Sequence, residues 1–171
     1  ARAALEYVRK IHFRPCDINT PVFVFRMAIG GWGNELSSIL NALAHSINEN
    51  RTLVLIHASR TTLASLSKYT PEDLFPMSSC QEVLNPREIP RTHWRRASDY
   101  TAMLESRFRD FKFHTRSSIL HSAAKPPFPY HDIGAFHWYR LLATHFFHPS
   151  IMLSKALITK ALSIHEGITP C

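Results

Sequence analysis

The sequence lacks several patterns that would identify its function at once. No apolar run approaches the ~18 residues that a membrane-spanning helix requires, so none of the 171 residues is expected to cross a bilayer. The chain has no Gly-x-Ser-x-Gly elbow, which leaves a serine hydrolase without support. No two cysteines have the Cys-x-x-Cys spacing of a zinc or thioredoxin-type site. Internal repeats and low-complexity segments are also lacking.

Apolar content and charge then define the class of protein. Hydrophobic residues make up 45% and charged residues 19%, which permits a buried core and excludes wholesale disorder. Twenty Lys and Arg against 13 Asp and Glu give a net charge of +7, compatible with nucleic acid, an anionic membrane surface or a phosphate-bearing ligand. Between Arg87 and Arg116 the basic residues are mixed with acids, which favours a solvated mixed-charge face over a nucleic-acid site.

The three cysteines, Cys16, Cys80 and Cys171, can form one disulfide and leave one thiol. Cys16 and Cys80 flank the best-formed part of the chain, which favours them as the pair if the compartment is oxidising; buried free thiols are the alternative. The sequence also has 11 histidines, of which His145 and His148 could share a helix face, with His137 and His131 upstream. Neither cysteines nor paired carboxylates converge with them, so we expect no metal site.

One stretch predicts a βαβ unit. The apolar run at residues 22–25 is typical of a buried parallel strand, and a glycine turn follows at 30–33. Asn34 stands at the N-cap position of a helix whose apolar stripe comprises Leu36, Ile39, Leu40, Leu43, Ala44 and Ile47. The helix is expected to end around residues 48–50, and a second apolar strand occupies residues 52–56. The predicted fold class is therefore α/β, with a parallel sheet covered by helices.

Outside this unit the signals are weaker. A helix is predicted over residues 1–11, another from Ser98 to about Arg107, and an extended, ordered loop over 125–130 because prolines disfavour helix there. Two helices are predicted after Gly134, the second from Ser150, and Ile168 looks like the start of a strand. We therefore expect residue 171 to be a truncation point.

The glycine turn is the strongest candidate for a ligand site, because glycines let backbone N–H groups approach a phosphate beside a helix N-terminus. A Walker A loop requires Gly-Lys-Ser/Thr, whereas Asn34-Glu35 follows here. Leu36 replaces the third glycine of a dinucleotide fingerprint, and no acidic residue follows Ile56. A nucleotide sugar or another phosphorylated ligand remains, beside the alternative of a tight turn without a ligand.

Four stretches together resemble the alpha-1,6-fucosyltransferases, which add core fucose to N-glycans, and more loosely the protein O-fucosyltransferases. They are the glycine loop at residues 31–36 with residues 50–55 after it, the Phe-x-Pro-x-Ser-type segment at 74–80, the proline-rich loop at 126–129, and the Trp-containing helix at 138–149. The order and spacing agree over about residues 12–171. At the glycine loop, Asn34 replaces a cysteine and residues 29–31 replace Lys-Gly-Cys. Of these, Asn34 is closer to the O-fucosyltransferase pattern.

This resemblance implies a Rossmann-like lobe, the first lobe of a GT-B-like glycosyltransferase, over residues 16–171, with residues 1–15 as the end of a helical stem or linker. It implies inverting transfer of fucose from GDP-fucose to an N-glycan or glycoprotein acceptor, without a metal or another cofactor, and without a nucleic-acid partner. It also implies a Cys16–Cys80 disulfide. By position, Gly31, Gly33 and Asn34 are the donor-binding candidates.

In the family, a His-x-Arg-x-x-Asp-Lys segment that grips the diphosphate would begin just after Cys171, and a second lobe would follow. The resemblance therefore assigns no catalytic residue to this chain and predicts that it is inactive without a C-terminal lobe. The parent protein would lie in the Golgi lumen behind an upstream membrane anchor. Two alternatives stay open: transfer of another sugar, and a non-catalytic α/β module that binds an anionic glycan or nucleic acid. Asn50-Arg51-Thr52 also fits the N-glycosylation sequon.

Overall fold

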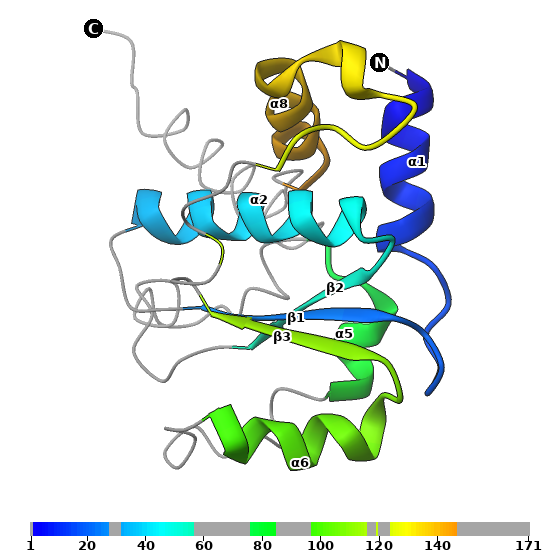
Figure 1. Cartoon of the computed structure of the whole chain (residues 1–171), viewed down its shortest axis with the longest axis vertical. Coiled ribbons are helices and arrows are strands. Elements are labelled where there is room, and N and C mark those ends of the chain that lie inside the picture. Colours follow the sequence, from blue (N-terminus) through cyan, green and yellow to red (C-terminus); the bar gives the residue numbers. More distant parts are fainter. Residues whose placement is uncertain are drawn as a thin grey trace, which may run out of the picture.

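The computed structural model describes residues 2–27, 32–56, 76–84, 97–115, 119 and 124–146. Within these ranges, three parallel strands form a sheet of order β2-β1-β3 (Figure 1). They are β1 (Val22–Arg26), β2 (Thr52–Ile56) and β3 (Phe111–Thr115). The α/β class and the parallel pairing of the first two strands are confirmed, and the fold is Rossmann-like.

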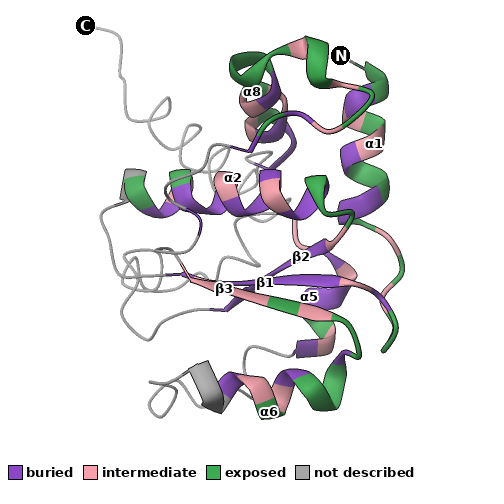
Figure 2. Cartoon of the chain, viewed as in Figure 1, coloured by how far each residue is buried: buried purple, intermediate pink, exposed green. Residues whose placement is uncertain are grey.

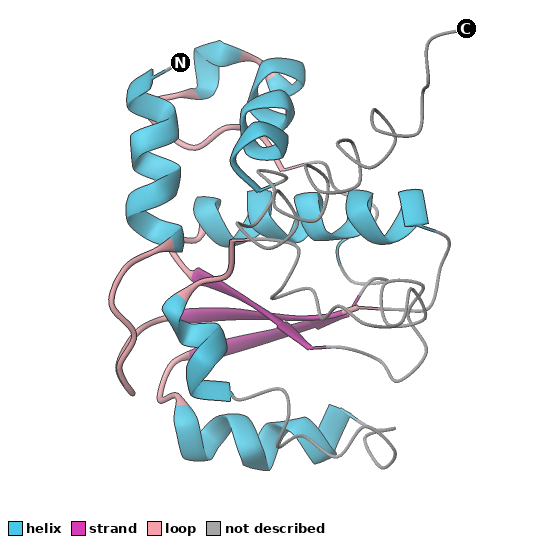
Figure 3. Ribbon diagram, turned by 180° about the vertical axis from the view of Figure 1, so that it is seen from behind, coloured by secondary structure: helices cyan, strands magenta, loops and turns pink. Residues whose placement is uncertain are grey.

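Helices cover both faces of this sheet (Figures 1 and 3). One face carries α1 (Arg2–His12), α2 (Trp32–Asn48) and α8 (Ala135–Phe146), which follows a short 3-10 helix, η1 (His131–Ile133). The other face carries α5 (Ser79–Leu84) and α6 (Ala97–Arg107). Among the described residues, no helix has the length and apolar character needed to cross a membrane.

Alternate residues of β1 enter two separate apolar clusters. Phe23 and Phe25 pack in the cluster that includes α1, α2 and α8, whereas Val22 and Val24 pack with residues of α5 and α6. All four side chains are fully buried, and Figure 2 shows most of β1 as buried. A strand that is covered on both faces has no solvent side, which is why its sequence is a continuous apolar run.

The apolar stripe of α2 is confirmed, because Ile39, Leu43 and Ile47 are fully buried. The predicted start of the helix is wrong: α2 begins at Trp32, so Asn34 is its third residue and not its N-cap. Glycine adopts helical backbone angles as well as turn angles, at a cost of about 1 kcal/mol relative to alanine. Gly33 was therefore a weak marker of where the turn ends.

The end of α2 is a Schellman motif centred on Asn50. The backbone N–H of Asn50 donates to the carbonyl of Ile47 at 3.1 Å, and that of Arg51 donates to Ser46 at 2.8 Å. These are the two hydrogen bonds that define a Schellman motif. Asn50 occupies its left-handed position, with φ 53°. The predicted end of the helix at residues 48–50 is thus confirmed.

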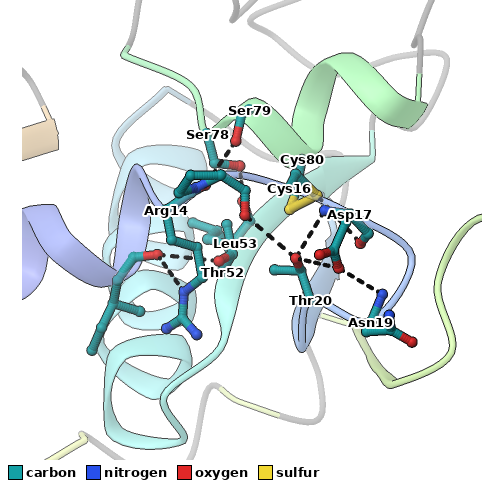
Figure 4. Close-up of a disulfide and its surroundings, with 12 residues drawn as sticks. Arg14, Cys16, Asp17, Asn19, Thr20, Thr52, Leu53, Ser78, Ser79 and Cys80 are labelled. Atoms are coloured by element: carbon teal, nitrogen blue, oxygen red, sulfur yellow. Dashed lines mark hydrogen bonds between the residues drawn. A yellow bond between two sulfur atoms is a disulfide. The ribbon is translucent and has the colours of Figure 1, made fainter.

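A disulfide joins Cys16, which precedes β1, to Cys80 of α5, with their Cα atoms 5.0 Å apart (Figure 4). Two serines that directly precede Cys80 form hydrogen bonds to the backbone of β2 and of the segment before Cys16. The Ser78 hydroxyl donates to the Leu53 carbonyl of β2, and the Ser79 hydroxyl donates to the Arg14 carbonyl, both at 2.8 Å. The Cys16–Cys80 pairing is therefore confirmed in the structure.

The remaining predictions have mixed outcomes. The helix predicted to run from Ser98 to Arg107 is confirmed as α6, and the first helix after Gly134 as α8. The loop over 125–130 is ordered, but it is not extended throughout, since a turn with a cis Phe128–Pro129 bond closes it. The predicted helix from Ser150 and the strand from Ile168 lie outside the described residues.

The first helix packs against the rest of the described fold. Ala4, Val8 and Ile11 of α1 are buried in the cluster shared with α2 and α8. The interpretation of residues 1–15 as the end of a stem or linker stays a prediction.

Candidate functional site

The candidate site lies at the carboxyl end of β1. The chain leaves β1 for α2 and β2 on one side of the strand, and reaches β3 on the other side through α5 and α6. The sheet order therefore reverses at β1. In open α/β sheets, ligands bind outside the carboxyl ends of the strands at such a topological switch point. In Figure 1 this edge is on the left, where α2 also begins.

Strand register identifies the residues at this edge. Arg26 is the last residue of β1, and it pairs with Ile56 of β2 and Thr115 of β3. Met27 continues the β1 pairing by donating its backbone N–H to the Ile56 carbonyl at 2.9 Å, and its side chain is buried. Backbone pairing between β1 and β2 therefore extends to residue 27, the last described residue before the glycine turn.

Arg26 is a cation that the sequence analysis did not identify. Its guanidinium carbon lies 5.6 Å from the ring centroid of Tyr100 in α6, within cation–π range. Tyr100 is itself buried and stacks on Phe113 of β3. Among the described residues the guanidinium has no hydrogen-bond partner, and the Arg26 side chain is half-buried. The one signal in the sequence was a charged residue directly ending an apolar strand.

The three donor-binding candidates from the sequence have different outcomes. Gly31 lies outside the described residues, and Gly33 falls in the first turn of α2. Asn34 is exposed in the same turn, and its carbonyl accepts the Ser38 hydroxyl at 2.7 Å. The first four N–H groups of a helix have no intrahelical acceptor and carry its positive dipole end. Gly33 and Asn34 thus lie where an anion would be favoured, and their role in donor binding stays a prediction.

Glu35 is a second residue that the sequence analysis did not assign. It is only 3% exposed, in the first turn of α2. A carboxylate there is stabilised by the positive end of the helix dipole. The spacing gave a signal, since Glu35 precedes the buried Ile39 by four residues and so lies on the same side of the helix.

A different pair of titratable groups joins α1 to α8. The rings of His12 and His145 are 5.2 Å apart, edge to face, and both side chains are buried. Burial, together with the nearby His145, lowers the pKa of His12 to about 3, although its hydrogen bond to the Pro76 carbonyl opposes this. Burial and the charge of Arg9 lower the pKa of His145 to about 4. Both imidazoles are therefore neutral at pH 7, and this pair is part of the core.

Other histidines considered for metal binding do not converge. His131 pairs with Asp132 at 3.2 Å on the surface, and His137 contacts Phe136 edge-on. His148 lies outside the described residues. Within the described part of the chain, no group of three or more His, Cys, Asp or Glu side chains could hold a metal ion.

Comparison of the chain with known protein families, with curated proteins and with solved structures yields no significant match. The assignment of a function therefore depends on the residues and on the geometry of the site.

Proposed function

We propose that this chain is the first α/β lobe of a GT-B-like fucosyltransferase, which transfers fucose from GDP-fucose to a hydroxyl of an N-glycan or glycoprotein with inversion. One observation carries the proposal. The connection that bears the glycine motif, between β1 and α2, lies at the topological switch point of the sheet. The motif that resembles the family's donor loop is thus at the position where α/β folds bind ligands.

The chemistry of the site suits a diphosphate. Negative charge develops on the GDP leaving group as its bond to fucose breaks, and fixed N–H dipoles and cations stabilise such charge. The N-terminal amides of α2 and the guanidinium of Arg26 are groups of this kind at the same edge. Arg26 would contribute a charge-assisted hydrogen bond, and Gly33 and Asn34 would lie beside the donor.

Inverting transfer also requires a base to deprotonate the acceptor hydroxyl. We assign no such base to this chain, nor any metal, and propose that the C-terminal lobe supplies the base and further cations. The proposal places the protein in the Golgi lumen. The Cys16–Cys80 disulfide supports an oxidising compartment of this kind.

The test is a transfer assay on two proteins, the 171-residue chain and the full-length protein. We expect the full-length protein to transfer labelled fucose from GDP-fucose to an N-glycan acceptor, and the chain alone to have no turnover. GDP-mannose and a UDP-sugar serve as donor controls. A full-length protein that is stabilised by another donor, and not by GDP-fucose, would make the parent a transferase of a different sugar.

The alternative of a non-catalytic module has its own readout. If no nucleotide sugar raises the melting temperature of the full-length protein, but heparin or an oligonucleotide binds with strong salt dependence, the proposal is wrong. Activity of the 171-residue chain alone would contradict the assignment of the base to a second lobe.

A further inference from the structure

The chain contains a single Asn-x-Ser/Thr sequon, Asn50-Arg51-Thr52, among its six asparagines. In a secreted protein this motif is an acceptor for an N-linked glycan, which must project from the surface once the protein has folded. The sequon spans the end of α2 and the first residue of β2, so its geometry is described.

Asn50 meets the requirements of such an acceptor. It is exposed at the C-terminal end of α2, where its φ of 53° turns the chain away from the helix axis. Arg14 fixes the orientation of its side chain: one guanidinium nitrogen donates to Asn50 Oδ1 at 2.7 Å and to the Asn50 carbonyl at 3.1 Å. The hydrogen bonds of Asn50 to described residues engage its oxygens and its backbone N–H, and leave Nδ2 unbonded.

Asn50 and Thr52 of the sequon also have structural roles. Asparagine is second to glycine at the left-handed position of a Schellman motif. The hydroxyl of Thr52 donates to the Ile11 carbonyl at 3.1 Å and is buried. The sequon hydroxyl is therefore accessible only before the chain folds, so any attachment must take place on the nascent chain.

A glycan on Asn50 would not obstruct the candidate site. Asn50 follows the C-terminus of α2, whereas the candidate site is at its N-terminus (Figure 1). The 17 residues of this helix separate the two ends by about 25 Å, at 1.5 Å per residue.

We propose that Asn50 is an N-glycosylation site of this protein. Nδ2 attacks C1 of an oligosaccharide carried by a lipid diphosphate, the C1–O bond to the diphosphate breaks, and the Nδ2–C1 bond forms as the amide loses a proton. Oδ1 is retained, so the Arg14 hydrogen bond persists in the modified protein. The proposal requires the oxidising secretory route that also suits the disulfide, and it does not depend on sugar-transfer activity.

The test uses the protein expressed from its own full coding sequence in eukaryotic cells. Peptide N-glycosidase in ¹⁸O-water converts a glycosylated asparagine to labelled aspartate, and mass spectrometry of the peptide that spans Asn50 detects it. We expect labelled aspartate at position 50, together with an electrophoretic shift that the enzyme abolishes.

Three variants make the result specific. Asn50→Asp keeps an oxygen acceptor for Arg14 and tolerates the left-handed angle, but it must lose the shift. Thr52→Ser keeps both the sequon and a hydroxyl for Ile11, and must retain modification, whereas Thr52→Val must lose it. Unmodified Asn50 in protein that contains the Cys16–Cys80 disulfide overturns the proposal. Unmodified Asn50 together with free thiols overturns it as well, and also removes the secretory assignment.

Discussion

The carboxamide of Gln81 forms two hydrogen bonds to the backbone of Leu55. Its Oε1 accepts the Leu55 N–H and its Nε2 donates to the Leu55 carbonyl, both at 2.8 Å. One side chain of α5 thus provides the hydrogen-bond donor and acceptor that a neighbouring strand would provide to Leu55 at the outer edge of β2. An uncovered edge is a template for pairing with other chains, so this contact both satisfies the Leu55 backbone and covers the β2 edge at that position.

We expect Gln81→Leu to lower the free energy of unfolding by about 2–6 kcal/mol. The substitution leaves a buried N–H and a buried carbonyl without partners, and each loss costs about 1–3 kcal/mol. Urea unfolding measures the change, and hydrogen exchange at the Leu55 amide should become faster. Glu82→Ala, at the exposed neighbouring position of α5, is the matched control and should change the stability by less than about 0.5 kcal/mol. Equal stabilities of Gln81→Leu and wild type would contradict this role.

The Cys16–Cys80 disulfide is expected to contribute about 4 kcal/mol to stability. It closes a loop with a sequence separation of 64 residues, and the chain-entropy model gives this value for such a length. The double variant Cys16→Ser/Cys80→Ser should therefore unfold at a lower urea concentration than the oxidised wild type.

Two measurements separate the disulfide from other effects of these substitutions. Reduction of the wild type should bring its stability close to that of the double variant, while reduction should leave the double variant unchanged. Cys171→Ser should behave like the wild type, because its thiol takes no part in the bridge. A loss of stability in Cys171→Ser instead would mean that the cysteines pair differently in solution.

Sequence alone was sufficient for β1, β2 and the body of α2, though not for the start of α2, and the physical reason is burial. Strands covered on both faces give continuous apolar runs, and a helix on a sheet gives the 3.6-residue stripe. β3 was not predicted from the sequence, because Lys112 and His114 interrupt its apolar pattern. Lys112 is exposed and reaches Glu49 at 2.6 Å, while the His114 ring stacks on Phe23 at 4.2 Å.

At the candidate site, sequence reasoning found the segment but not the groups that surround it. The glycine motif is local, so its position between a strand and a helix could be predicted. The contact of Arg26 with Tyr100 joins residues far apart in the sequence, and it depends on α6 packing under β1. No local pattern contains that information.

The buried histidine pair predicts that stability falls in acid. In the unfolded chain both imidazoles have pKa values near 6.5, whereas in the folded protein those of His12 and His145 are about 3 and about 4. Between pH 6.5 and about 4 the unfolded state therefore binds more protons, so the free energy of unfolding decreases as the pH decreases. Each histidine contributes up to about 1.4 kcal/mol per pH unit in this window.

Variants isolate the contribution of this pair from that of other groups. His145→Phe removes one titrating group and keeps an aromatic ring beside His12, so the slope of stability against pH between 6 and 4.5 should decrease. His137→Gln, an exposed histidine on the same helix, should keep the wild-type slope. Urea unfolding at several pH values gives the slopes, and equal slopes for all three proteins would exclude the pair as the cause.

Arg26 offers the sharpest test of the proposed donor site. Arg26→Met in the full-length protein removes the charge and keeps an unbranched side chain over Tyr100, with a favourable sulfur–aromatic contact. A hydrogen bond to a charged group is worth about 1.5–3 kcal/mol, so calorimetry should show GDP-fucose binding weakened by about 10- to 100-fold. Lys112→Met removes the same charge from the adjacent strand near its amino end, and it should leave binding within about twofold of wild type, because exposed charges beyond about one Debye length are largely screened. If both variants weaken binding equally, the effect is one of net charge, and Arg26 does not contact the diphosphate.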